Sequence, residues 1–265
     1  MSEAQPRKYS PLMRTALLLT AALLGMRSSA QTEGQCMATG GRAALDKLFE
    51  QELHYPAVAL EAGIRGEVVI TALLAPDGAV RSLVVGKALA PECDQEALRV
   101  ARMIIWKPAT SGELCSGKEV HLAVPFDPSR YKRWLKERVK HEGDRFAAPV
   151  DTSLAVLQPK QLEAQVSPSI PGGMMGLPAF ISKEMRYPNE AMRYSLEGTV
   201  KLEFVVEPSG SLSNMHVLQS VGGGCTDEAM RLLYRIPWQP ALKDGKRVRS
   251  ILQVPIRFDL PKQRQ

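Results

Sequence analysis

The chain has 265 residues, of which 45% are hydrophobic, 23% charged and 6% aromatic, and its formal net charge is +6. This balance is typical of a globular protein and excludes a disordered, a collagen-like and a polytopic membrane chain. At about 100–150 residues per domain, the length predicts two domains.

The first 30 residues have the pattern of a secretory signal peptide. Basic residues, Arg7, Lys8 and Arg14, precede a largely apolar run at 15–26, and small residues follow at 28–30. This order predicts cleavage after residue 30 and export to the periplasm. The alternative is an uncleaved inner-membrane anchor, although a bilayer span needs about 20 apolar residues.

Cleavage also lowers the net charge of the remaining chain, which bears on its possible partners. Removing residues 1–30 takes away four basic residues and one acidic residue, so the formal net charge falls from +6 to +3. Without clustering on one face, this excess is too small for an electrostatic footprint on phosphates. We therefore expect no nucleic-acid partner.

The rest of the chain contains an internal repeat at an offset of 132 residues. The aligned pairs include Tyr55-Pro56 with Tyr187-Pro188, Gly66 with Gly198, Cys93 with Cys225, and Trp106 with Trp238. Near Cys115 we expect two extra residues in the first copy, so that the offset becomes 130 and Val124-Pro125 matches Val254-Pro255. The repeat predicts two tandem domains, domain 1 (residues 40–127) and domain 2 (residues 171–260).

Each copy predicts the same order of helices and strands. A helix leads to Tyr-Pro and a short second helix, then two strands form a hairpin, and another helix and an alternating strand follow. The ranges are 42–53, 67–74, 80–85, the helix after Cys93, and 120–126 in copy one, and 174–185, 199–206, 212–218, the helix after Cys225, and 252–258 in copy two. Helices packed on a small antiparallel sheet make each copy an α+β domain.

Residues 128–170 connect the two domains as a basic helix followed by a linker. Residues 129–146 hold seven Lys or Arg against three acidic residues, with Tyr131 and Trp134 on an apolar stripe. The stripe either rests on domain 1 or places the helix on an anionic membrane surface. Four prolines between 149 and 171 predict a linker.

We find no pattern for catalysis, metal binding or a cofactor. The four histidines, His54, His121, His141 and His216, lack metal-ligand spacing, and no nucleophile or phosphate-loop motif is present. The run Gly222–Gly224 precedes a helix and could hold an anion, but a tight turn explains it equally well. We therefore expect no enzymatic activity.

The cysteines favour a structural disulfide over redox chemistry. Cys93 and Cys225 lie near helix N-termini, which lowers a thiol pKa, but neither belongs to a Cys-x-x-Cys pair. With Cys36 and Cys115, four cysteines allow three pairings. Cys93 with Cys115 is the first choice, because Cys115 occupies the expected insertion.

The last strand of each copy is predicted to be an edge strand. Each contains a proline, Pro125 or Pro255, which cannot donate to a ladder and is normally confined to edges, strand ends or bulges. An exposed edge can accept an extended peptide from a partner. Equally, Pro255 with Arg249 and Arg257 could simply blunt the edge against aggregation.

A set of motifs in the second copy resembles the C-terminal domain of TonB-like energy transducers. The set is Tyr187-Pro188, Gly198-Thr199-Val200, Pro208-Ser209-Gly210, Gly222–Gly224 with Cys225-x-x-Glu228-Ala229, Ile236-Pro237-Trp238-x-Pro240, Asp244-Gly245-Lys246 and Val254-Pro255-Ile256-x-Phe258. The first copy is similar but more diverged. The resemblance covers about residues 40–127 and 171–259.

The resemblance implies a periplasmic domain whose last strand pairs with a short segment of an outer-membrane receptor. It places the partner-binding strand at Arg249, Ser250, Ile251, Leu252, Gln253, Val254, Ile256 and Phe258, with residues 118–126 as the weaker counterpart. We therefore expect a module that binds envelope or outer-membrane receptor proteins by strand addition. The alternative is a membrane-anchored energy transducer for outer-membrane transport.

Overall fold

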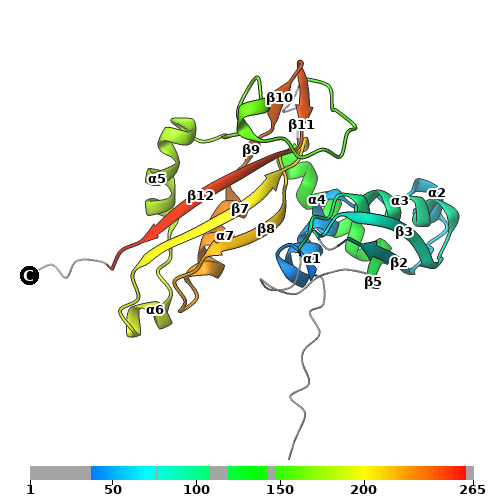
Figure 1. Cartoon of the computed structure of the whole chain (residues 1–265), viewed down its shortest axis with the longest axis horizontal. Helices are drawn as coiled ribbons and strands as arrows, with labels where there is room; N and C mark the ends of the chain where they lie inside the picture. The colour runs from blue at the N-terminus through cyan, green and yellow to red at the C-terminus, as the bar shows by residue number, and fades with distance from the viewer. Residues whose placement is uncertain (1–36, 76, 108–118, 143–146, 261–265) are drawn as a thin grey trace, which may run out of the picture.

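The computed structural model describes residues 37–75, 77–107, 119–142 and 147–260. The predicted signal peptide, Cys36 and Cys115 lie outside these ranges. The described chain forms two α+β units of the same design, which confirms the fold expected from the repeat (Figure 1).

The two domains repeat their elements in the predicted order. Domain 1, with the strand that leads into it, contains β1 (Met37–Ala38), α1 (Gly41–Glu52), α2 (Ala57–Glu61), β2 (Gly66–Leu74), β3 (Val80–Lys87), α3 (Pro91–Arg102), β4 (Trp106–Lys107) and β5 (Glu119–Phe126). Domain 2, with the strand that leads into it, contains β6 (Ser167–Pro168), α5 (Gly173–Glu184), α6 (Asn189–Arg193), β7 (Gly198–Val206), β8 (Leu212–Gln219), α7 (Cys225–Arg235), β9 (Trp238–Gln239), β10 (Ala241–Lys243), β11 (Lys246–Val248) and β12 (Ser250–Phe258).

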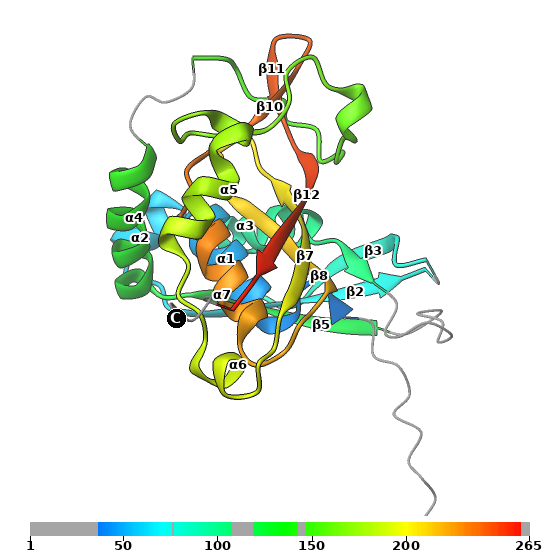
Figure 2. The ribbon, with the colours of Figure 1, turned by 90° about the vertical axis from the view of Figure 1, so that its left-hand side faces the viewer.

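Each domain is built on a three-stranded antiparallel sheet. The strand order is β3-β2-β5 in domain 1 and β12-β7-β8 in domain 2, so the last strand of each copy lies at an edge. α3 packs on the first sheet and α7 on the second. Figure 2 shows α5 and α7 beside β12.

The same polar clamp holds the helix layer together in both copies. In domain 2, Arg231 donates two hydrogen bonds of 2.6 Å to Glu228 and one of 2.9 Å to the Glu184 carbonyl oxygen. Glu228 also accepts the Arg186 N–H at 2.6 Å. Burial alone would raise the pKa of Glu228, but the bonds from Arg231 and Arg186 outweigh it and lower that pKa. Glu96 and Arg99 form the matching clamp in domain 1.

The pairing register corrects the expected change of offset. Phe126 lies opposite Gly66, and Phe258 lies opposite Gly198, so the last strands keep the offset of 132. Pro125 therefore corresponds to Arg257, and the Val-Pro match at an offset of 130 was wrong. When the two last strands are aligned by their pairing, Val124-Pro125 and Val254-Pro255 lie two residues apart. Each strand carries one proline, but the two prolines occupy different positions along the edge.

The segment between the domains packs on both of them. α4 (Pro128–Glu142) rests on domain 1, where Tyr131 and Trp134 join the apolar core. This is one of the two placements expected for the basic helix. The linker pairs with domain 2, through Ala164 on Leu242 of β10 and through β6 on β9, and it includes a 3-10 turn, η2 (Pro159–Gln161). None of the helices in the described ranges has the length and apolar character that crossing a bilayer requires.

Domain 1 lies against β8 of domain 2. The Asn214 side chain accepts the Ile105 N–H at 2.8 Å and donates to the Met103 carbonyl oxygen at 3.1 Å. Gly40 approaches so closely that a Cβ there would lie 2.1 Å from the Met215 carbonyl oxygen. α1 and β8 are therefore in direct backbone proximity, and only glycine fits at position 40.

A buried carboxyl group of domain 1 reaches into domain 2 at this interface. Glu52 accepts hydrogen bonds from the hydroxyls of Ser209, at 2.7 Å, and Ser211, at 2.5 Å. Burial, and next the charge of Glu207, raise the pKa of Glu52, while the two hydroxyls and Arg99 act against the rise.

We expect the raised pKa of Glu52 to lower the free energy of unfolding as the pH rises. Its pKa in the folded protein lies above the ordinary value of 4.5. Between these two values the folded state binds more protons than the unfolded state, so the free energy of unfolding falls with rising pH. Glu52→Gln removes this loss, and its stability advantage over the natural protein should grow from pH 4 to pH 7 in urea titrations.

The counterpart in copy two is a matched control. Glu184 takes the same position in domain 2 and pairs at the surface with Arg235 at 3.2 Å. Glu184→Gln should change the free energy of unfolding by less than about 1 kcal/mol. A Glu52→Gln advantage that shrinks toward neutral pH would contradict the assignment.

Candidate functional site

Domain 2 has one sheet edge covered by domain 1 and one that is partly open. β8 forms the first edge and packs against α1. β12 forms the second edge and lies on the side away from domain 1, next to α5 (Figure 1). β12 is therefore the edge of domain 2 at which another chain can add.

The linker already occupies the outer side of the first part of β12. Leu157 donates its N–H to the Arg249 carbonyl oxygen at 2.9 Å, and its own carbonyl oxygen accepts the Ile251 N–H at 3.1 Å. The backbone groups of a paired strand alternate between its two sides. The odd-numbered residues of β12 therefore direct their N–H and C=O groups outward, away from β7.

Three outward-facing residues follow the part that the linker covers. They are Gln253, Pro255 and Arg257, and all three are exposed. Within the described residues, the outward N–H groups of Gln253 and Arg257 have no backbone partner. Pro255 has no N–H, and it lies where a ladder bond to β7 is not lost. The open edge offers two donors and three acceptors.

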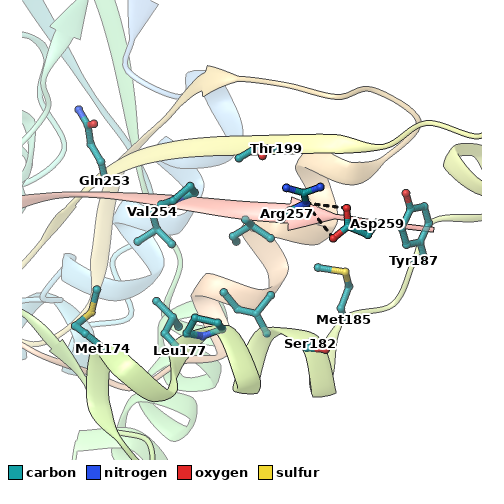
Figure 3. A pocket seen from close by; sticks show the side chains of 14 residues that line it. Met174, Leu177, Ser182, Met185, Tyr187, Thr199, Gln253, Val254, Arg257 and Asp259 are labelled. Atoms are coloured by element: carbon teal, nitrogen blue, oxygen red, sulfur yellow. Dashed lines mark hydrogen bonds and ion pairs between the residues drawn. The ribbon is translucent and has the colours of Figure 1, made fainter. Parts of the chain in front are cut away.

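An apolar groove of about 830 Å³ lies between this edge and α5 (Figure 3). Leu177 and Ile181 of α5, with Met185 directly after the helix, form one wall, and Tyr187 closes one end. Arg257 lines the opposite wall, where its side chain donates to Asp259 at 2.8 Å. The groove thus places apolar side chains beside unpaired backbone groups.

The α5 wall was not predicted from the sequence. One signal was available in the repeat: Met174, Pro178 and Ser182 of this wall replace Arg42, Asp46 and Glu50 of the first copy. Three charged residues of α1 thus correspond to uncharged residues of α5. The exchange indicates that this face of the helix has different neighbours in the two domains.

The predicted partner-binding strand divides into three parts. Arg249 and Ser250 are buried, and Ile251 is bonded to the linker. Val254, Ile256 and Phe258 direct their side chains into the core, while Leu252 is half-buried. Gln253 is the one exposed side chain of the predicted set, and the structure adds Pro255 and Arg257 to it.

Arg249 joins three parts of the chain. Its guanidinium donates to Glu207 at 2.8 and 2.9 Å, and both groups are buried. It also donates to the Leu154 carbonyl oxygen of the linker at 2.8 Å and to the Met103 carbonyl oxygen of domain 1 at 2.9 Å. Arg249 therefore holds the start of β12 in place and is not available to a partner.

The counterpart strand in domain 1 has a different edge. Lys118, at the start of the predicted counterpart, lies outside the described residues. At the offset of 132, His121, Ala123 and Pro125 take the positions of the three open residues of β12. Pro125 removes an outward donor that Arg257 supplies, so the two edges present different hydrogen-bond patterns.

The structure describes two of the four cysteines, and it corrects the expectation of a lowered thiol pKa. Cys93 and Cys225 are free thiols, each fully buried in the core of its domain, whereas Cys115, the proposed partner of Cys93, lies outside the described residues. Burial also raises the pKa of both thiols, and at Cys93 nearby acidic groups raise it further. Desolvation outweighs the helix N-terminus here, which makes both thiols inert structural groups.

Close packing explains the glycine run, and among the described residues the histidines belong to no group arranged as a metal site. A Cβ at Gly223 would lie 2.9 Å from the backbone of Ala191, so close packing against α6 accounts for glycine there. In the described ranges no group of His, Cys, Asp and Glu side chains has the arrangement of a metal site.

Comparisons with known proteins agree with the repeat. The family model described as Gram-negative bacterial TonB protein C-terminal matches twice, at residues 51–127 and 183–260. Among solved structures, the chain is similar to the NMR solution structure of the TonB C-terminal domain of Helicobacter pylori. The identity is 22%, the coverage is 34% of this chain and 82% of that chain, and the TM-score is 0.27. A search of curated proteins found no match.

We expect Arg249→Leu to destabilise the protein by about 3–5 kcal/mol, because it leaves the Glu207 carboxylate buried without its partner. Arg257→Leu is the matched control in the same strand, since it removes only the exposed pair with Asp259. That variant should lose less than about 1 kcal/mol. Urea unfolding measures both, and equal losses would contradict the structural role of Arg249.

Proposed function

The chain belongs to the Gram-negative bacterial TonB protein C-terminal family, and we propose that domain 2 binds an extended segment of an envelope or outer-membrane receptor protein. The segment adds to β12 at Gln253–Arg257, on the periplasmic side of the envelope. The observation that carries this proposal is a sheet edge with unpaired outward backbone groups directly beside an apolar groove.

Backbone pairing alone supplies only part of the affinity. The open edge offers five hydrogen-bonding groups, at about 0.5–1.5 kcal/mol net for each bond formed. Ordering the partner segment and losing its free motion oppose this gain. Apolar side chains of the segment must therefore enter the groove between β12 and α5, where burial contributes about 25 cal/mol per Å².

The linker sets where the partner segment can pair. Leu157 already bonds to Arg249 and Ile251 on the outer side of β12. A partner strand can therefore pair only beyond Ile251, over Gln253, Pro255 and Arg257. This restricts the partner to a short segment and fixes its register, because a slip toward the start of β12 would meet the linker.

The proposal assigns a binding role without catalysis. What the groove offers is apolar surface from α5 and backbone groups from β12. An ion pair at its rim, between Arg257 and Asp259, lies at the exposed end of β12. Discrimination among partners then depends on the side chains that alternate along the added strand.

Proline substitution at the outward positions tests strand addition. Gln253→Pro with Arg257→Pro removes both outward N–H donors, while the bonds to β7 from the even-numbered residues stay in place. Losing two bonds should weaken capture of outer-membrane receptor proteins from envelope extracts about 10- to 100-fold.

The matched control is Gln253→Ala with Arg257→Ala, which removes the same side chains and keeps both donors. It should retain most of the capture, and thermal unfolding should show that both double variants are folded. Equal capture by the proline and alanine variants would exclude pairing through these backbone groups.

We also propose that residues 1–30 are a signal peptide removed on export. They contain a basic start, an apolar run and a small-residue end. Sequencing the exported protein should give Gln31 as its first residue. An intact N-terminus in the membrane fraction would instead support the membrane-anchored energy transducer.

A further inference from the structure

The groove of domain 2 is open, whereas a helix covers the corresponding surface of domain 1. In domain 1, α4 leaves the end of β5 and lies against α1. Its side chain Tyr131 contacts Tyr55 at 5.4 Å between ring centroids, and Arg130 reaches Asp46 at 3.8 Å. Tyr55 and Asp46 are the counterparts of Tyr187 and Pro178, which line the groove of domain 2. α4 therefore covers the site in domain 1 that is open in domain 2.

Burial follows this occupancy. Tyr55, which Tyr131 of α4 contacts, and nearby Leu53 are buried, with 6% and 1% of their surface exposed. Their counterparts Met185 and Tyr187 are half-buried. The described residues of domain 2 contain no helix in the position of α4. The same fold thus presents an apolar surface that one copy covers from within the chain and the other leaves to solvent.

The side chains of α4 indicate what kind of helix fits this apolar surface. Two aromatic side chains, Tyr131 and Trp134, enter the core of domain 1, and Arg130 lies over the Trp134 ring at 4.6 Å. Residues three apart on a helix share one face. The ion pair of Arg130 with Asp46 has no equivalent on α5, since Pro178 replaces the aspartate.

The domain 2 surface is also more apolar and more adaptable. Met174 is 42% exposed at the rim of the groove and replaces Arg42 of domain 1. Methionine is flexible and polarizable, and it makes favourable contacts with aromatic rings. The wall of α5 is therefore suited to aromatic side chains without a matching charge.

We propose that the α5 wall of the groove binds a short amphipathic helix of a partner protein that presents two aromatic side chains three residues apart. The helix lies against α5 as α4 lies against α1. This inference uses the same groove as strand addition, but it rests on its α5 wall and needs no backbone group of β12. A helix is one recognised occupant of an apolar groove, read through anchors at such spacing.

A peptide copy of α4, residues 127–142, is the probe. In the full chain, domain 1 already holds its own α4 through a direct covalent connection, which gives a high effective concentration. The added peptide should therefore bind to domain 2, with a Kd on the order of 0.1 mM for two buried aromatic side chains. Methyl NMR of the methionines reports the position: Met174 and Met185 signals should shift, while that of Met103 in domain 1 should not.

Two matched pairs make the test specific. A peptide with Tyr131→Ala and Trp134→Ala should bind at least about tenfold more weakly. On the protein, Ser182→Glu places a charge on the groove wall, and Ala179→Glu places the same charge on an exposed part of α5 outside it. Only Ser182→Glu should weaken binding of the natural peptide, again by about tenfold.

Three results would overturn the proposal. They are the absence of saturable Met174 and Met185 shifts at millimolar peptide, equal binding of the two peptides, and equal binding to the two glutamate variants. Strand addition is judged separately, from the difference between proline and alanine variants of β12. Failure of the helix probe with that difference intact removes this inference and leaves strand addition standing.

Discussion

The guanidinium of Arg249 is the interaction on which the arrangement of the binding edge depends. It is buried at the start of β12, where it bonds Glu207 of domain 2, the Leu154 carbonyl oxygen of the linker and the Met103 carbonyl oxygen of domain 1. A buried ion pair contributes little net stability relative to an apolar replacement, but its geometry is strict. Arg249 therefore fixes, relative to one another, the three segments that decide which part of β12 is covered.

The repeat explains how one fold supports two different surfaces. The Glu-x-x-Arg clamp and the edge-to-face Tyr and Phe rings, with centroids 5.4 Å apart in domain 1 and 5.8 Å in domain 2, hold α1 and α5 in the same place in each copy. What differs lies outside this frame: α4 covers α1, whereas the linker covers only the start of β12. The asymmetry thus comes from the connecting residues together with the exchanges on the helix face and the sheet edge that they adjoin.

The sequence predicted most of the fold, but it did not predict which segments cover α1 and the start of β12. Gly, Pro and Trp recur at a constant offset because turns and core positions tolerate few residue types, and the alternation of β12 follows from one buried face. The register of β5 was misjudged because Val124-Pro125 and Val254-Pro255 look alike, although their prolines serve different positions. The linker residues 149–157 carry no periodicity, since their bonds to β11 and to the start of β12 use backbone groups that any residue has. Similarly, nothing local marks Cys93 as fully buried, which decides its chemistry.

An open sheet edge is a risk of aggregation, and this chain limits the risk without closing the site. The linker pairs with the edge as far as Ile251, so only a short stretch remains. Within it, Pro255 withholds one donor and the charged Arg257 lies at the end, both of which discourage pairing with another flat edge. If β12 of a second molecule paired with this edge, the missing N–H of Pro255 and the repulsion between the two Arg257 charges would weaken the pairing. A partner segment with apolar side chains gains in addition the groove wall of α5, and this difference lets the edge accept a partner while it resists self-association.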